Sequence, residues 1–194
     1  MPRLIVAVAA AGLVASLGLP VSAGAQERSI QRGFAQGGTV RLNLSAGEYE
    51  ITASPDDTIR VAWRSEGRDD DVDVNIEVRG AQAEVAIDGP SENFHVELQL
   101  PRRTNVVAEL SAGELELRGI EGSKDVSARA GEIRIAVGDR AQYRRVDASV
   151  RIGELAADAF DVTKGGFFRS FQWTGKGQYD LRAHLTVGEL RLDR

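Results

Sequence analysis

One short pattern recurs through this chain and constrains its fold more than any other feature. A Gly-Glu pair is flanked on both sides by alternating apolar and polar residues, in five copies centred on Gly47, Gly113, Gly131, Gly153 and Gly188. Such alternation is typical of a strand with one buried face, because successive side chains point to opposite sides of a sheet. Each copy therefore predicts two strand segments that meet at the glycine.

The alternation shifts by one residue at each of these glycines. In one copy the apolar residues are Ala108, Leu110 and Ala112 before the glycine, and Leu115 and Leu117 after it. A shift that keeps both halves facing one core requires a bulge or a corner, where glycine supplies backbone angles that other residues adopt only at a cost. We therefore predict a structural corner at each Gly-Glu pair.

The copies centred on 113, 131 and 153 have the spacing of short repeats, which bury their apolar face only by stacking on a neighbour. Between residues 54 and 101 the pattern is plain alternation, with a hairpin turn at 79–82. No helical period of ten residues or more is present. The sequence thus predicts an all-β fold, a stacked-strand, β-solenoid-like or rolled sheet with Gly-Glu corners, preceded by antiparallel hairpins. A β-sandwich with bulged strands is the alternative.

The N-terminus has the features of a secretory signal peptide. A short basic start precedes an apolar run at 4–19, and small residues at 23–25 fit a signal peptidase site. We expect cleavage after Ala25, with a retained anchor as the alternative. The absence of cysteine excludes disulfides, Cys-ligated metals and a lipidated cysteine. We expect an exported protein, periplasmic or extracellular and associated with a bacterial cell envelope.

The remaining chain is predicted to hold a polar lead-in at 26–38 and one all-β domain at 39–194. Residues 39–100 would contain the first copy and the hairpins, and residues 101–194 the repeats. An irregular segment at 158–180 combines aromatic and cationic side chains. Such a segment can stack on sugar rings or lie on a membrane, or it can cap the open end of a sheet. Its candidate binding residues are Phe167, Phe168, Arg169, Phe171, Trp173, Lys176 and Tyr179.

The sequence offers little for catalysis. Its two histidines, His95 and His184, each lie between apolar strand residues and should point outward. No nucleophile elbow, zinc-protease motif, P-loop or dinucleotide fingerprint is present. We expect no enzyme, no catalytic residue and no cofactor.

Metal binding is the other chemistry to consider. The stretch at 71–75 begins like a calcium loop, but Ile76 replaces the required glycine and Gln82 the required glutamate. If Glu114, Glu132 and Glu154 occupy adjacent corners, their charges lie one strand spacing apart and need compensation. Arg129 and Arg151, backbone N–H groups or a cation would supply it. We expect no metal site and keep these three glutamates as the remaining candidates.

With these residues in view, the chain resembles the putative-adhesin family of bacterial exported domains, whose repeats carry the same Gly-acidic-aliphatic corner. The matching segments are 98–122 (LQLPRRTNVVAELSAGELELRGIEG), 127–135 (SARAGEIRI) and 186–192 (TVGELRL). The resemblance covers most of residues 38–194. It implies a stacked-strand β fold outside the cytoplasm and an adhesion-like role, and it brings no catalytic residues with it.

We therefore expect an exported, non-enzymatic structural or interaction module of the bacterial cell envelope, with an envelope protein or a glycan as its partner. A carbohydrate- or polyanion-binding protein that uses residues 160–179 is the alternative, and a hydrolase or lyase on the same scaffold is a third possibility. The net charge of −5 argues against a nucleic-acid partner. Signal cleavage would leave no transmembrane span.

Overall fold

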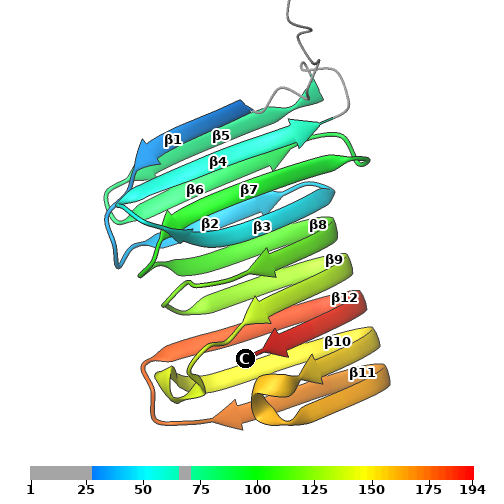
Figure 1. Cartoon of the computed structure of the whole chain (residues 1–194). Helices are drawn as coiled ribbons and strands as arrows, with labels where there is room; N and C mark the ends of the chain where they lie inside the picture. Colours follow the sequence, from blue (N-terminus) through cyan, green and yellow to red (C-terminus); the bar gives the residue numbers. More distant parts are fainter. Residues whose placement is uncertain (1–27, 66–70) are drawn as a thin grey trace, which may run out of the picture.

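The structure, a computed structural model, describes residues 28–65 and 71–194, without the side chains of residues 164, 165 and 167. Twelve strands form one large mixed sheet that does not close on itself (Figure 1). The predicted all-β class is confirmed. The strands are β1 (Arg28–Gly33), β2 (Thr39–Leu44), β3 (Gly47–Ser54), β4 (Thr58–Ser65), β5 (Asp73–Arg79), β6 (Gln82–Asp88), β7 (Phe94–Pro101), β8 (Asn105–Leu117), β9 (Lys124–Ala136), β10 (Tyr143–Ala157), β11 (Val162–Thr174) and β12 (Tyr179–Asp193). Two 3-10 turns, η2 (Arg140–Gln142) and η3 (Asp158–Phe160), flank β10.

A column of glycines crosses the sheet and divides it into two layers. Residue pairing aligns Gly47, Gly113, Gly131, Gly188, Gly153 and Gly166, in that order, across β3, β8, β9, β12, β10 and β11. The first layer contains the halves of β8, β9, β12 and β10 before their glycine, the end of β11, and β2, β6 and β5. The second layer contains the remaining halves with β3, β7, β4 and β1.

The core lies between these two layers and takes side chains from both halves of each long strand. The residues that the alternation placed in the core are at most 3% exposed: Leu110, Leu115, Ile133, Val150, Leu185 and Leu190. Residues on both sides of each glycine therefore contribute to one core, and their predicted burial is confirmed.

The residue immediately before each glycine is an exception to the predicted alternation. Ile152 and Val187 are 42% and 44% exposed, and Ala112 and Ala130 are only half-buried. The prediction that these residues face the core is wrong. The strand begins to bend at this residue, so its side chain lies on the outside of the corner rather than between the layers. We refer to this row of apolar side chains as the crest.

The order of the repeats also departs from the sequential stacking of a solenoid. β8 and β9 are parallel neighbours, but β12 lies between β9 and β10, with both of which it is parallel. β11 pairs antiparallel with the other side of β10. Because the β10–β11 hairpin occupies the far edge of β10, the last strand takes the remaining position beside β10.

Two segments expected to be irregular are strands. β11 fills most of residues 158–180, and β1, at the edge of the sheet beside β4, lies within residues 26–38. The alternation of β11 is hidden in the sequence because its backbone departs from a regular strand. Gly166 has φ of 115° and Phe168 has φ of 51°, so the pleat is interrupted where two aromatic residues are adjacent.

Candidate functional site

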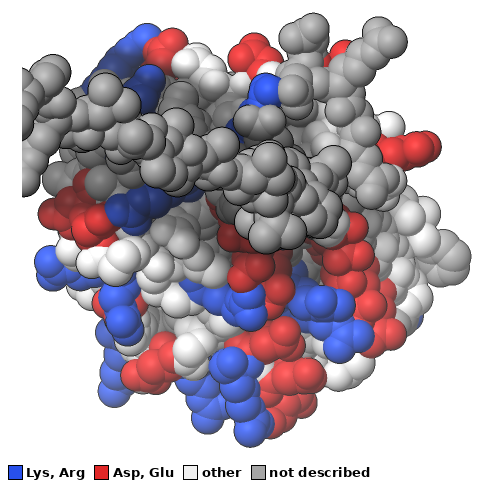
Figure 2. Space-filling view, turned by 45° about the horizontal axis from the view of Figure 1, so that its top comes forward, with Lys and Arg blue, Asp and Glu red and all other residues white. Residues whose placement is uncertain are grey.

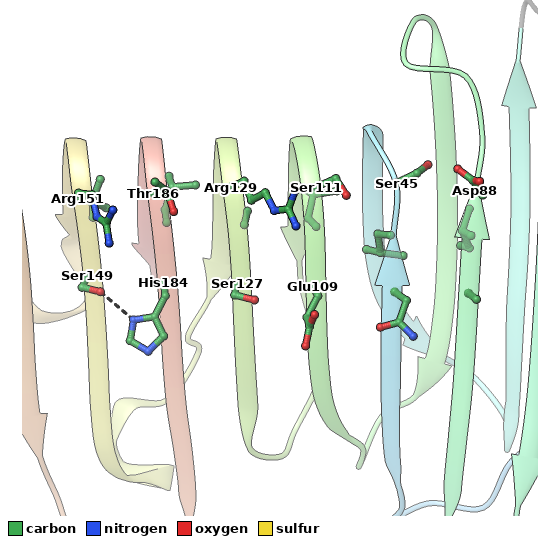
Figure 3. A pocket seen from close by; sticks show the side chains of 18 of the residues that line it. Ser45, Asp88, Glu109, Ser111, Ser127, Arg129, Ser149, Arg151, His184 and Thr186 are labelled. Carbon is green, nitrogen blue, oxygen red and sulfur yellow. Dashed lines mark hydrogen bonds between the residues drawn. The ribbon is translucent and has the colours of Figure 1, made fainter.

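A groove of about 890 Å³ runs across the outer surface of the first layer (Figure 3). It crosses β6, β2, β8, β9, β12, β10 and β11, and the start of β5 lines one end. With strands roughly 4.8 Å apart, a groove that spans seven of them is on the order of 30 Å long. These dimensions fit an extended ligand that lies across the strands.

The groove side chains alternate with the core side chains of the same strands. Ser127, for example, lies between the buried residues Val126 and Ala128 and points to the opposite side of the sheet. Strand pairing then places equivalent residues side by side in two rows. The outer row contains Asn43, Glu109, Ser127, His184, Ser149 and Ser170. The inner row, nearer the glycines, contains Ser45, Ser111, Arg129, Thr186, Arg151 and Phe168.

Half of these twelve side chains carry hydroxyl groups, which both donate and accept hydrogen bonds. Ser149 Oγ lies 2.8 Å from His184 Nδ1, and Ser45 Oγ accepts a hydrogen bond of 3.1 Å from the Gly89 N–H. A serine beside a histidine is one part of a nucleophilic site, but catalysis also needs a group that orients the ring. No described carboxylate is bonded to the His184 ring, so we interpret this pair as a polar surface for binding.

The two ends of the groove carry opposite charge. Asp73 and Asp88 face each other across β5 and β6, and Glu109 follows on β8. Arg129 on β9 and Arg151 on β10 line the other end. Figure 3 shows Arg129 and Arg151 on the two strands that flank Thr186. A ligand in the groove therefore meets an acidic end and a basic end.

Two arginines of the basic end have no charged partner among the described residues. Within the described chain, Arg129 and Arg151 form no ion pair and no side-chain hydrogen bond. Arg169 on β11 pairs with the buried residue Val150, so its side chain points to the core side of the sheet, where its Nε has no hydrogen-bond partner among the described residues. Arginines of the second layer are different: Arg134 Nε lies 2.7 Å from Glu132 Oε1, and Arg118 contacts Glu50. Arg41 on β2, outside the groove, also has no ion pair in the described chain, so Arg129 and Arg151 differ from it by lying together in the groove.

The glutamates of the Gly-Glu pairs lie on the second layer, away from the groove. Their order across the sheet is Glu48, Glu114, Glu132, Glu189 and Glu154. Glu114 and Glu132 lie on adjacent strands, but Glu132 and Glu154 do not, because β12 places Glu189 between them. No group of three or more metal-ligating side chains occurs within residues 28–65 and 71–194.

Arginines two residues further along the strands compensate the charge of two glutamates of this column, Glu132 and Glu189. Arg134 and Arg191 both pair with Glu132, and Arg191 also pairs with Glu189. Arg129 and Arg151, which we considered for this role, lie instead in the groove of the first layer. At the β3 end of the column, His95 Nδ1 lies 2.7 Å from Glu48 Oε2.

The aromatic and basic candidate residues of the segment 167–179 do not lie together on one surface of the structure. Phe171 is 8% exposed, and it packs with Trp173 around the Phe160 ring at centroid distances of 5.2 Å. Phe168 is 79% exposed and lines the groove with Arg169. Tyr179 is half-buried beside Tyr143, and Lys176 is exposed in the turn before β12. The Phe167 side chain lies outside the described residues.

A buried lysine near the start of β9 was not foreseen. Lys124 occupies an apolar position of the alternation and is 2% exposed. Its Nζ donates to the Tyr143 hydroxyl at 2.6 Å and to the Gly122 carbonyl at 3.3 Å. Burial lowers the pKa of Lys124 from 10.5 to about 8 and raises the pKa of Tyr143 from 10.0 to about 12. Both shifts follow from the cost of placing a charge among apolar groups.

Charges of both signs are mixed over the rest of the visible surface. Figure 2 shows acidic and basic side chains interleaved on the face turned to the viewer. A nucleic-acid-binding protein usually carries a continuous basic patch or stripe.

The sequence matches no protein-family model, and no curated protein matches it significantly. Among solved structures, a putative cell adhesion protein from Clostridium sporogenes is similar with a TM-score of 0.55. The sequences are 12% identical, and the similarity covers 87% of this chain and 99% of that chain. The chain shares that fold. A putative adhesin from Bacteroides fragilis is similar over 86% of this chain and 96% of that chain, at 8% identity and a TM-score of 0.39.

The structural similarity confirms the resemblance to putative adhesins at the level of fold. None of the described residues belongs to a helix long and apolar enough to span a membrane. The expected signal peptide at 1–25 lies outside the described residues.

Proposed function

We propose that this protein is an exported, non-enzymatic interaction module of the bacterial cell envelope, with an adhesion-like role. The single observation that carries the proposal is the groove, which presents two rows of mostly polar side chains across six neighbouring strands of the sheet. Binding residues on such a scaffold hold a fixed geometry. The features of a signal peptide at 1–25 and the lack of cysteine support export to the envelope.

The side-chain contacts within the groove also favour binding over catalysis. The groove holds Ser149 and His184 without a described orienting carboxylate, and its serines recur in register from strand to strand. Repeated hydroxyls suit a ligand that is itself repetitive or extended. The repeats would act as stacked rungs, as in a solenoid-like or rolled sheet, and each rung would add one binding position. The fold of the Clostridium sporogenes protein supports the adhesion-like role by analogy.

A bulky side chain in the groove tests this proposal. Ser127 lies in the outer row of the groove, so Ser127→Trp should obstruct it without changing the core. Arg134→Trp places the same side chain on the second layer of the same strand and is the matched control. In a sedimentation assay with purified bacterial envelope fragments, we expect wild type and Arg134→Trp to bind and Ser127→Trp to lose binding. Wild-type binding by Ser127→Trp would contradict the proposal.

A further inference from the structure

The basic end of the groove indicates the chemistry of its ligand. We propose that the groove binds an extended acidic polysaccharide, whose carboxylates are held by Arg129 and Arg151 and whose hydroxyls are held by the serine and threonine rows. This inference rests on the proposed function of the groove as a binding site, and it names the ligand class.

The first step concerns the arginines. On the second layer, arginines of β9 and β12 are paired with carboxylates, as Arg134 is with Glu132 and Arg191 is with Glu189. Arg129 and Arg151 have no such partner within the described chain. A guanidinium group has five N–H donors in a planar fork that matches a carboxylate. These two side chains therefore present unused donors to an anionic ligand in one groove.

The second step concerns their spacing. Arg129 on β9 and Arg151 on β10 are separated by β12, so their backbones are two strand spacings apart, or about 10 Å. Arg169, on the next strand beyond β10, pairs with the buried residue Val150 and so does not extend this series. Arg129 and Arg151 thus recur along the groove with one strand between them. A chain that carries an acidic group at regular intervals can meet them in sequence, whereas a single small anion would occupy only one.

The third step concerns the groups between the arginines. Thr186, Ser149 and Ser170 lie on β12, β10 and β11, within the same part of the groove. Their hydroxyls are spaced by one strand and can exchange hydrogen bonds with the hydroxyls of sugar units. Phe168 is 79% exposed at the β11 end and offers an aromatic face for a sugar ring. Hydroxyls, guanidinium groups and one exposed ring together fit an acidic sugar chain.

Two other polymers fit the groove less well. A peptide strand binds most readily at a sheet edge, through free backbone groups, but β9, β12 and β10 are paired on both sides. A nucleic acid carries a charge on every nucleotide, and Asp73, Asp88 and Glu109 would repel it at the other end of the groove. A polysaccharide can place its acidic units over β9 and β10 and neutral units over the acidic end.

The test uses unesterified oligogalacturonate as the probe and isothermal titration calorimetry as the measurement. Each charge-assisted contact contributes roughly tenfold to affinity, so Arg129→Gln/Arg151→Gln should bind on the order of a hundredfold more weakly than wild type. Arg134→Gln/Arg191→Gln removes the same charge from the second layer and should bind like wild type. The fully methyl-esterified oligomer, which has the same chain without its charges, should not bind.

Other outcomes would overturn the inference. Equal losses in the two double variants would show that net charge, not the groove, determines binding. Inorganic polyphosphate that binds as tightly as oligogalacturonate, with the same dependence on Arg129 and Arg151, would show a general anion site. No oligogalacturonate binding, together with envelope binding that Ser127→Trp abolishes, would refute the acidic polysaccharide and leave the proposed function intact. Envelope binding that Ser127→Trp does not change would instead refute the proposed function.

Discussion

The α-carbon of Gly131 lies so close to Gly113 that a Cβ at position 131 would stand 1.8 Å from the Gly113 carbonyl oxygen. The same relationship continues across the sheet: a Cβ on Gly188 would meet the oxygen of Gly131, and one on Gly153 would meet that of Gly188. Gly131 also has φ of 119°, which residues with a side chain rarely adopt. Glycine is therefore required here by close backbone stacking as well as by backbone angle.

Replacing Gly131 tests this stacking. Gly131→Ala combines backbone strain with a clash against a backbone atom, so we expect the free energy of unfolding to fall by roughly 2–5 kcal/mol in urea denaturation. Gly138→Ala is the matched control, because Gly138 also has a positive φ of 65° but open space around its Cβ position. It should lose only about 1–2 kcal/mol. Equal losses would mean that backbone angle alone explains the glycine column.

A second pair of variants separates the core from the crest. Leu115 is 1% exposed, and Leu115→Ala should lower the free energy of unfolding by about 2–5 kcal/mol. Ile152 is 42% exposed, so Ile152→Ala should cost less than about 1 kcal/mol. Chemical denaturation of both variants measures the difference. A large loss in Ile152→Ala would contradict the position of this side chain on the outside of the corner.

The two phenylalanines of β11 should behave differently. Phe171 is 8% exposed against Phe160, and Phe171→Ala should cost about 3–5 kcal/mol. Phe168 is 79% exposed and has φ of 51°, so Phe168→Gly removes little packing and relieves an unfavourable backbone angle. Its melting temperature should equal or exceed that of wild type. A large drop for Phe168→Gly, or none for Phe171→Ala, would be inconsistent with this account of β11.

Lys124 should make the free energy of unfolding depend on pH in the alkaline range. Its pKa is about 8 in the folded protein, against 10.5 for an exposed lysine. Between these values the unfolded chain binds more protons than the folded protein, so the free energy of unfolding rises with pH. The melting temperature of wild type relative to Lys124→Met should therefore rise from pH 8 to pH 10. Tyr143, whose pKa is raised to about 12, acts in the opposite direction only above pH 10. A difference that stays constant from pH 7 to pH 10 would refute a buried charge at this position.

The all-β fold and most of the core could be predicted because period-two alternation records which side of a strand is buried. The position of β12 could not, because pairing between distant strands leaves no local mark in the sequence. β11 was hidden for a different reason: its glycines and the positive φ of Phe168 break the alternation within the strand. The exposure of Ile152 was missed because apolarity alone does not separate an inward side chain from one at a bend.

The groove was only partly visible in the sequence. The polar residue two positions before each glycine, such as Arg129 or Arg151, was recognised as outward-facing. A second polar residue lies four positions before the glycine, as Ser127 does before Gly131 and His184 before Gly188. This recurrence was the signal for a second row, and it was overlooked. That the rows form a groove depends on the sheet bend and on the strand order. Neither can be read from a single strand.

The central claim, that the groove is the binding surface, is tested most directly by the two histidines. His184 lies in the groove on the first layer, and His95 lies on the second layer. Modification by diethyl pyrocarbonate, followed by peptide mass spectrometry, measures the access of reagent to each ring. The protein is compared free in solution and adsorbed on purified bacterial envelope fragments, and each histidine is compared with itself. We expect adsorption to slow the modification of His184 and to leave His95 unchanged. Protection of His95 with an unchanged rate at His184 would contradict the account.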